Sequence, residues 1–256
     1  MAKPTITCLI PARMSSSRFP GKPLAKIHGL AMIGHVYRQA LKWKRFDRIY
    51  VVTPDREINQ YCYDHGFFSV NTTPTPNDCL DCAAIGLEEL SKVWQETDRY
   101  VILQGDEPLF DCSILDSISF TPEISNLYTN FQDDCDIDNH NVVKVLMTRQ
   151  HQAIYFSRTS LPQIHESTMR KYHPCMTLKQ LGVYIFSPRM LRAFHYLQPT
   201  ILEDHEGIGM NRLIENGIPI QMQFSQHDSI SVDVSSDIQK IESILEERNK
   251  QCNTQS

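Results

Sequence analysis

The chain has 256 residues, of which 41% are hydrophobic and 21% charged, and a formal net charge of −5. This length and composition are typical of a globular protein with one large domain, or of a domain with an added lobe. The acidic balance argues against general binding to nucleic acid or to a membrane surface, so an anion site would have to be a local cluster of basic residues.

Neither a membrane span nor a disulfide framework is expected. No apolar run approaches the ~20 residues that cross a bilayer, and the stretch before Arg13 is too short for a signal peptide. The eight cysteines are scattered along the chain, which favours reduced thiols and a cytoplasmic protein. Cys79 and Cys82 form a Cys-x-x-Cys pair, but no second pair at ligand spacing accompanies them, so we interpret them as incidental thiols.

Strands alternate with helices through the first part of the chain. Four short runs of apolar or β-branched residues are predicted strands: 6–10, 48–53, 67–70 and 99–103. Three segments with helical signals lie among them: 32–41, 55–66 and 83–93. This alternation predicts an α/β fold with a mostly parallel sheet covered on both faces, and ligands bind such sheets beyond the carboxyl ends of the strands.

The second half of the chain is less regular. We expect a helix and a connector over 112–128 and a solvated Asp-rich loop over 133–139, which lacks the Gly and Glu of a calcium loop. Further strands are predicted at 141–145, 153–158, 179–186 and 218–224. Further helices are predicted at 188–197 and 236–248.

Positive charge is concentrated just after the first strand. Arg13, Arg18 and Lys22 place three cations within ten residues, and Gly21 allows the backbone to approach a ligand closely. A strand, a cationic loop and then a helix are a typical setting for binding phosphates. The alternative is that these are solvated charges beside a turn, and the P-loop pattern is absent. We favour a polyanion site.

A second polar turn, Gln104 to Leu109, follows the strand at 99–103. Asp106 in this turn is well placed to hold Mg²⁺, which prefers oxygen ligands and substrate phosphates. Taken alone, a turn Asp that caps the backbone beside Pro108 would be the better interpretation. Opposite a cationic loop, the metal site is favoured.

These motifs resemble those of the CMP-Kdo synthetases, or 3-deoxy-manno-octulosonate cytidylyltransferases. Residues 9–24 match the family's opening strand, Pro-Ala-Arg and Pro-Gly-Lys-Pro-Leu, and 104–108 match its Gln-Gly-Asp-Glu-Pro. Asp233 follows Val232 as in the Val-Asp that supplies the family's second metal carboxylate; without the match we would interpret it as a helix-start acid. The resemblance implies a Rossmann-like sheet of the nucleotide-diphospho-sugar transferase type.

The resemblance also implies how the domain and the reaction are organised. We expect a single domain, 1–256, in which 111–178 partly forms a small lobe over the acceptor site and contributes to a homodimer. The expected activity is Mg²⁺-dependent: a hydroxyl of Kdo, or of a Kdo-like acid, attacks the α-phosphorus of CTP and releases pyrophosphate, in lipopolysaccharide biosynthesis. The catalytic candidates are Arg13, Lys22, Asp106 and Asp233, of which the two Asp hold the metal. The nucleotide-binding candidates are Pro11, Ala12, Arg13, Arg18, Lys22, Asn77, Asp78 and Gln104.

Acceptor-binding candidates come from three further motifs. Arg158 ends a Tyr-Phe-Ser-Arg stretch and binds either a substrate carboxylate or the Asp-rich loop. Gln180 stands where the family has His, and Tyr184 closes the same motif; Gln cannot carry a proton's charge, which leaves the identity of the sugar open. Glu203 and Glu206 share a helix face, directed either at the sugar or at the helix N-terminus.

One stretch departs from the family. Relatives that make CMP-Kdo have Ser-Gly-Thr-x-Arg where residues 77–81 read Asn-Asp-Cys-Leu-Asp, which is more similar to spore-coat SpsF-type nucleotidyltransferases. The alternatives are therefore CTP-dependent activation of another acid (an amino-Kdo, a nonulosonic acid or a phosphonate) and a non-catalytic nucleotide-binding regulator. An NAD-binding oxidoreductase is disfavoured, because no Gly-x-Gly-x-x-Gly follows a strand.

Overall fold

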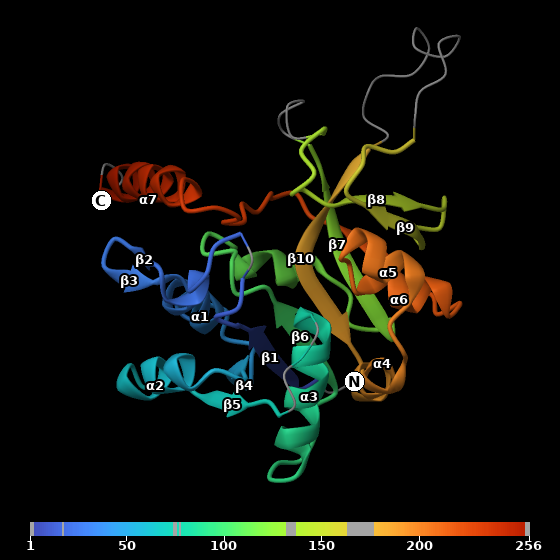
Figure 1. Cartoon of the computed structure of the whole chain (residues 1–256), viewed down its shortest axis with the longest axis horizontal. Helices are drawn as coiled ribbons and strands as arrows, with labels where there is room; N and C mark the ends of the chain where they lie inside the picture. Colours follow the sequence, from blue (N-terminus) through green and yellow to red (C-terminus); the bar gives the residue numbers. More distant parts are fainter. Residues whose placement is uncertain are drawn as a thin grey trace, which may run out of the picture.

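The structure, a computed structural model, describes residues 3–16, 18–73, 76, 78–131, 137–162 and 177–253. Within these residues the chain forms a nine-stranded mixed sheet and a two-stranded hairpin. The strands of the large sheet are β1 (Ile6–Pro11), β4 (Arg48–Thr53), β5 (Ser69–Asn71), β6 (Arg99–Leu103), β7 (Ile124–Asn130), β8 (Lys144–Met147), β9 (Ala153–Ser157), β10 (Leu178–Phe186) and β11 (Gln221–Phe224). Their order is β11-β7-β10-β6-β1-β4-β5, and β8 pairs with β10 and β9 (Figure 1).

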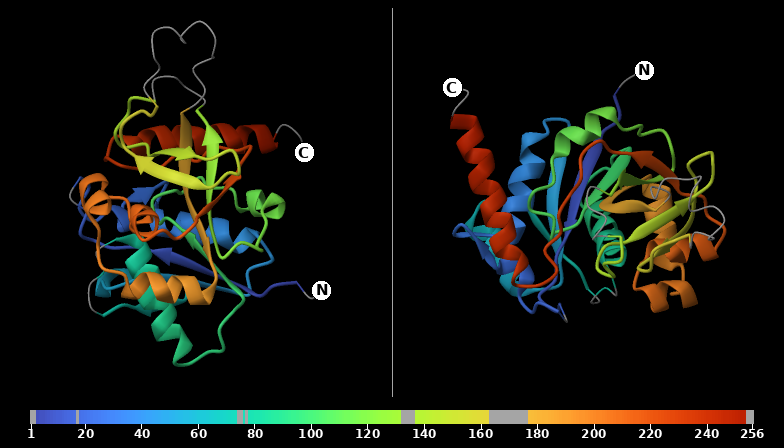
Figure 2. Two further views of the ribbon diagram at one scale, coloured as in Figure 1. Left: turned by 90° about the vertical axis from the view of Figure 1, so that its right-hand side faces the viewer. Right: turned by 90° about the horizontal axis from the view of Figure 1, so that it is seen from above.

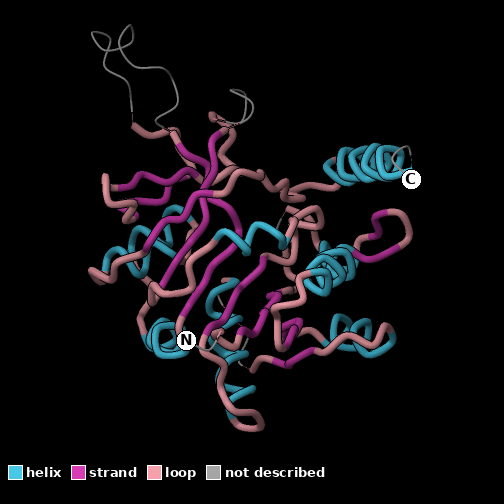
Figure 3. The backbone as a smooth tube through the Cα atoms, turned by 180° about the vertical axis from the view of Figure 1, so that it is seen from behind, coloured by secondary structure: helices cyan, strands magenta, loops and turns pink. Residues whose placement is uncertain are grey.

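Helices and a small hairpin surround this sheet. The α-helices are α1 (Met32–Lys42), α2 (Arg56–Asp64), α3 (Cys79–Ser91), α4 (Pro188–Tyr196), α5 (Ile201–Glu206), α6 (Met210–Glu215) and α7 (Asp237–Asn253). Two 3-10 helices are η1 (Lys22–Leu24) and η2 (Cys112–Ser117), and the hairpin is β2 (Lys26–Ile27) with β3 (Leu30–Ala31). The helix α7 packs against this hairpin (Figure 3). No helix among the described residues is long and apolar enough to span a membrane.

The part of the sheet nearest the N-terminus is parallel, as the sequence predicted. Strands β6, β1, β4 and β5 are neighbours that run in the same direction. Every residue of β1 is buried: Cys8 and Ile10 share a core with α1 and α2, whereas Leu9 shares one with α3. Successive side chains of a strand point to opposite faces, so this division places helices on both faces of the sheet (Figure 2).

Residues 112–128, predicted as a helix and a connector, are instead η2 and most of strand β7. The prediction was wrong because Asn126, Thr129 and other polar residues of β7 are buried and hide its strand pattern. The side-chain amide of Asn126 donates to the carbonyls of Leu181 and Val183 at 2.9 and 2.8 Å. The neighbouring strand thus satisfies polar atoms that the sequence alone would place in solvent.

Other boundaries shift by a few residues. The predicted strands 141–145 and 218–224 each begin three residues later than expected, and the predicted helix 83–93 begins earlier, at Cys79. The helix α6 lies where no element was predicted.

The lobe predicted within 111–178 lies partly outside the described residues, which leave out 132–136 and 163–176. Its described part includes β8 and β9, which extend the sheet at one end of β10 (Figure 1). The Asp-rich stretch 133–139 falls mostly within the same gap, so its interpretation as a solvated loop stays a prediction.

A buried charge cluster joins three of the helices. Arg212 in α6 is 1% exposed, and its guanidinium contacts the carboxylates of Asp81 at 2.7 Å and Glu203 at 2.5 Å. Asp81 belongs to α3 and Glu203 to α5, so one cation links all three elements. Buried carboxylates are costly without such a partner, and the cluster therefore depends on Arg212.

The substitution Arg212→Met should lower the free energy of unfolding by about 3–5 kcal/mol, because it leaves two buried carboxylates unpaired. Arg192→Met is the matched control: Arg192 also bridges two carboxylates, Glu88 and Glu96, but its side chain is 34% exposed. The control should cost about 1 kcal/mol or less. Urea unfolding followed by circular dichroism measures both, and equal losses would contradict this role of the cluster.

Candidate active site

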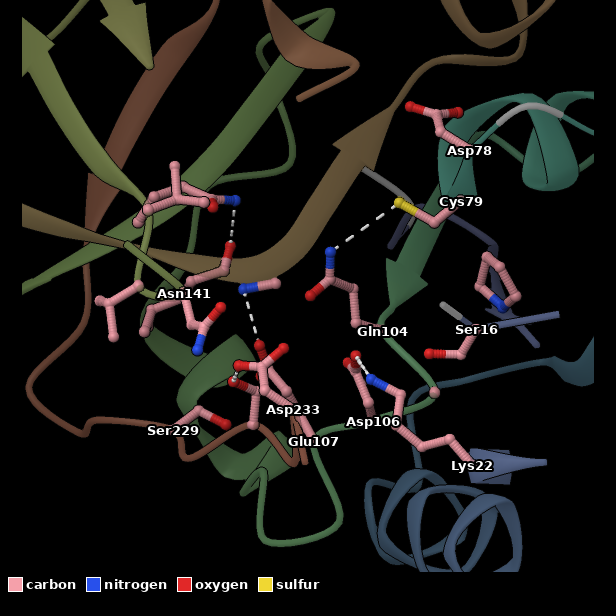
Figure 4. A pocket seen from close by; sticks show the side chains of 18 of the residues that line it. Ser16, Lys22, Asp78, Cys79, Gln104, Asp106, Glu107, Asn141, Ser229 and Asp233 are labelled. Atoms are coloured by element: carbon pink, nitrogen blue, oxygen red, sulfur yellow. Dashed lines mark hydrogen bonds and ion pairs between the residues drawn. The ribbon is translucent and has the colours of Figure 1, made fainter. Parts of the chain in front are cut away.

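A cleft of about 920 Å³ opens at the carboxyl ends of β1 and β6. Its walls come from the loop after β1, the turn after β6, the start of α3, the strand β10 and the loop 228–233 (Figure 4). These segments lie far apart in sequence, and the sheet brings them to the edge at which parallel α/β sheets bind ligands.

The loop after β1 brings three predicted cations to the cleft: Arg13, Arg18 and Lys22. The backbone N–H of Met14 donates to Oδ2 of Asp55 at 2.6 Å, which ties this loop to the start of α2. Gly21 has a φ of 75°, a left-handed conformation that disfavours other residues, and η1 begins directly after it. Backbone geometry therefore fixes where the cations enter the cleft.

The loop after β1 that carries Arg13, Arg18 and Lys22, here called the basic loop, contacts both of the predicted metal carboxylates. The Nζ atom of Lys22 lies 2.6 Å from Oδ2 of Asp106 and 2.9 Å from the carbonyl oxygen of Val232 (Figure 4). Arg18 forms an ion pair of 3.0 Å with Asp233. The basic loop, the turn that carries Asp106 and the segment that carries Asp233 are distant in sequence, and their charged side chains contact one another in the cleft.

Asp106 and Asp233 suit a hard divalent cation. Oδ1 of Asp106 is buried and has no hydrogen-bond partner among the described residues. The backbone N–H of Val232 donates to the carbonyl of Asp106 at 2.9 Å, which holds the segment that carries Asp233 against the turn after β6. The described residues contain no group of three or more His, Cys, Asp or Glu that could hold a metal ion. An octahedral Mg²⁺ here would therefore need phosphate oxygens or water besides the two carboxylates.

The side chains of Gln104, Gln180 and Tyr184 form a hydrogen-bonded wall of the cleft. Nε2 of Gln104 donates to the hydroxyl of Tyr184 at 3.0 Å, and Nε2 of Gln180 donates to it at 3.2 Å. Nε2 of Gln180 also donates to the carbonyl of Leu181 at 2.7 Å, which fixes the orientation of its amide. The Tyr184 oxygen accepts two hydrogen bonds, so its own hydrogen must be donated elsewhere. Burial raises the pKa of Tyr184, which stays a neutral donor.

Gly182 lies in an irregular part of β10, between Gln180 and Tyr184. A Cβ atom there would lie 2.3 Å from Oε1 of Glu107 and 2.5 Å from Oε1 of Gln104, so a larger residue would displace both side chains from their present positions. The backbone N–H of Gly182 donates to Glu107 at 3.0 Å. Burial raises the pKa of Glu107 to about 7, although this N–H and the charge of Lys179 oppose the shift.

Arg158 lines the cleft, but its guanidinium also has partners within the protein. Nε donates to the carbonyl of Glu206 at 2.6 Å, and Nη1 donates to the carbonyl of His140 at 3.0 Å. The next residue, Asn141, accepts a hydrogen bond from Arg18. The loop 139–141 therefore connects Arg158 to Arg18 of the basic loop.

Two predicted acceptor residues do not line the cleft among the described residues. Glu203 binds Arg212, and Glu206 accepts hydrogen bonds from the backbone N–H of Arg158 at 2.8 Å and the hydroxyl of Tyr155 at 2.9 Å. This geometry favours structural roles for both carboxylates. Asn77 lies outside the described residues, so its role stays a prediction.

The remaining predicted residues do line the cleft: Pro11, Ala12, Asp78, Gln104, Gln180 and Tyr184. Sequence reasoning missed several others: Glu107, Asn141, Lys179, Asp228 and Ser229. Glu107 could have been found from its place beside Asp106, whereas the other four stand in no pattern that marks a site.

Asp78 combines a structural role with a place in the cleft. Its carboxylate caps α3 by accepting a hydrogen bond of 2.7 Å from the backbone N–H of Asp81. A Cβ atom on Gly209 would lie 1.9 Å from Oδ2 of Asp78, so the start of α6 leaves room for this carboxylate. Burial and the charge of Asp81 raise the pKa of Asp78 to about 6.

The fold and the cleft define a nucleotide-binding α/β enzyme, and comparisons with known proteins make this specific. The cytidylyltransferase family model matches residues 7–223. The chain belongs to this family.

Several relatives align over nearly their whole length. The 3-deoxy-manno-octulosonate cytidylyltransferase of Thermodesulfovibrio yellowstonii is 32% identical over 93% of this chain and 97% of its own. The 8-amino-3,8-dideoxy-manno-octulosonate cytidylyltransferase of Shewanella frigidimarina is 37% identical over the same shares. A solved CMP:2-keto-3-deoxy-manno-octonic acid synthetase complexed with CTP has a TM-score of 0.81 and 27% identity, and covers 95% of this chain and 99% of its own.

The raised pKa of Asp78 predicts how stability depends on pH. The pKa of Asp78 rises from its usual value of 3.8 to about 6 in the folded state. Ionisation therefore destabilises the folded state, and stability is lost as pH rises from about 4 to about 6. Asn caps helices equally well. The variant Asp78→Asn should therefore gain stability over the native protein across this window and keep a constant advantage above it.

Asp98→Asn is the control with the opposite sign, because a hydrogen bond from Thr5 lowers the pKa of Asp98. That variant should be less stable than the native protein at neutral pH, and the difference should shrink as pH falls. Denaturant unfolding between pH 4 and 8 measures both. A pH-independent difference for Asp78→Asn would refute the assignment.

Proposed function

We propose that this cytidylyltransferase activates a 3-deoxy-octulosonate with CTP and forms the CMP-sugar acid and pyrophosphate. The observation that carries the proposal is the meeting of Lys22 and Arg18 with Asp106 and Asp233 inside one cleft. The names of the relatives support the choice of nucleotide and acid. The 8-amino form of the acid is the second candidate, because the Shewanella relatives named for it are 36–37% identical.

In the proposed reaction, the anomeric hydroxyl oxygen of the acid attacks the α-phosphorus of CTP. The bond between the α-phosphorus and the oxygen that links it to the β-phosphorus breaks, and pyrophosphate leaves with that oxygen. The hydroxyl proton passes to water. Such transfers need positioning and neutralisation of charge rather than covalent chemistry by the protein. Arg13, Arg18 and Lys22 would bind the triphosphate and stabilise the departing pyrophosphate.

Asp106 and Asp233 would hold Mg²⁺, which supplies charge neutralisation at the phosphates and polarises the reacting phosphoryl group. Lys22 and Arg18 form ion pairs with these carboxylates. On binding of the metal nucleotide, both cations would exchange a carboxylate partner for phosphate oxygens.

The acceptor would lie against Gln104, Gln180 and Tyr184, with Arg158 at the edge of the same wall. The hydroxyl of Tyr184, which accepts from both amides, would donate its hydrogen to the acid.

From the same family resemblance, we also propose a cytoplasmic homodimer that serves lipopolysaccharide biosynthesis.

The test measures pyrophosphate release from CTP with each candidate acid, in Mg²⁺ and after chelation with EDTA. We expect release with the octulosonate or its 8-amino form, and loss of release with EDTA. Asp106→Asn should lower kcat by about 100-fold or more, because the metal loses a charged ligand. The control Asp98→Asn changes a carboxylate at the other end of β6 and should keep the native kcat.

Several outcomes would contradict the proposal. Release with UTP or ATP but not with CTP would refute the choice of nucleotide. Native turnover by Asp106→Asn, or undiminished turnover in EDTA, would refute the metal site. Calorimetric titration of Mg²⁺ with CTP into both variants gives a second readout, in which only Asp106→Asn should bind more weakly.

A further inference from the structure

One basic residue that lines the cleft, Lys179, is not among the residues that we propose to bind the triphosphate. Lys179 lies in β10, and its side chain is 11% exposed. Its Nζ atom contacts Oδ1 of Asp228 at 2.7 Å and the carbonyl oxygen of Ser229 at 2.9 Å. An ammonium group has three N–H donors, and the hydrogen bonds of Lys179 to the described residues use two of them. One donor therefore remains for a ligand in the cleft, which Lys179 lines.

Lys179 and Lys22 bind the same short loop from its two ends. Asp228 and Ser229 begin the loop, whereas Val232 accepts a hydrogen bond of 2.9 Å from Lys22 and donates its N–H to Asp106. The charge of Lys179 also acts on the carboxyl of Glu107, the neighbour of Asp106. Two lysines thus hold the loop 228–233 against the cleft, Lys22 from the basic loop and Lys179 from β10.

We propose that Lys179 binds the carboxylate of the acceptor acid and thereby places the reacting hydroxyl. This inference rests on the proposed function. In the ring form of a 2-keto sugar acid, the carboxylate and the anomeric hydroxyl are bonded to the same carbon. The carboxylate must therefore bind next to the point of attack, and a largely buried ammonium that lines the same cleft outside the basic loop meets that condition.

Arg158, the sequence-based candidate for this contact, has a different arrangement. Its Nε atom donates a hydrogen bond to the carbonyl of Glu206, and its Nη1 atom donates one to the carbonyl of His140. These bonds hold the end of β9 to α5 and to the loop before β8. We assign Arg158 to positioning of the acceptor wall and the carboxylate contact to Lys179.

The test separates a substrate contact from a merely structural ion pair. Lys179→Met removes the ammonium, and the double variant Lys179→Met with Asp228→Asn also removes the carboxylate that the first change leaves unpaired. We expect the KM for the acid to rise by about 10- to 100-fold in both, the range of a hydrogen bond to a charged group. The KM for CTP should stay within about 3-fold of the native value, because the basic loop is untouched. Lys179→Arg, which keeps the charge, should recover part of the affinity.

A substrate analogue gives an independent readout. Calorimetry compares binding of the acid with binding of its C1 carboxamide, which has the same shape without the charge. The native protein should bind the acid about 10- to 100-fold more tightly, and Lys179→Met should show a preference of about 2-fold or less. A structural role for Lys179 predicts an equal preference in the native protein and in the variant.

Failure of this inference is distinguishable from failure of the proposed function. If the double variant restores the native KM for the acid, or if Lys179→Met keeps the native preference for the acid over the amide, Lys179 is structural and only the inference fails. If the native protein neither binds nor turns over any of the acids, the proposed function and the inference fail together. Loss of CTP affinity equal to loss of acid affinity also refutes a specific carboxylate contact.

Discussion

The cleft depends on one ammonium group, that of Lys22, which contacts Asp106 at 2.6 Å and Val232 at 2.9 Å. These contacts join the loop after β1, the turn after β6 and the segment before α7. Lys22 and Arg18 each neutralise the charge of one carboxylate of the cleft, Asp106 and Asp233 respectively, through an ion pair. In the proposed reaction the metal nucleotide takes over this neutralisation, so substrate binding becomes an exchange of ionic partners.

The strand β10 determines the opposite wall. It runs antiparallel between β6 and β7, and its irregular stretch between Gln180 and Tyr184 opens toward the cleft. The amide of Asn126 donates to the carbonyls on both sides of Gly182, so these two carbonyls keep hydrogen-bond partners where the backbone departs from regular pairing. The absence of a side chain at Gly182 then lets Gln104 and Glu107 reach the strand. The result is a polar wall of the cleft inside an otherwise apolar sheet, and we propose that it binds the acceptor.

Some residues of the site could be predicted from the sequence, and others could not. Arg13, Lys22 and Asp106 stand in short motifs directly after strands, where chain geometry and a family resemblance agree. Lys179 and Asn141 are single polar residues in segments without a site pattern, and nothing local distinguishes them from solvated side chains. Glu203 shows the converse: its motif suggested a ligand contact, but Arg212 lies nine residues later and holds its carboxylate inside the protein.

By itself, the sequence determined the alternation of strands and helices, the basic loop and the cytidylyltransferase resemblance, because these depend on local periodicity and contiguous motifs. Only the tertiary structure decided that β7 is a strand, that Lys22 meets Asp106 and Val232, and that Lys179 reaches the same loop. Partners such as Lys22 and Val232 are 210 residues apart. Contacts at that separation follow from the order and direction of strands in the sheet, which no local pattern encodes.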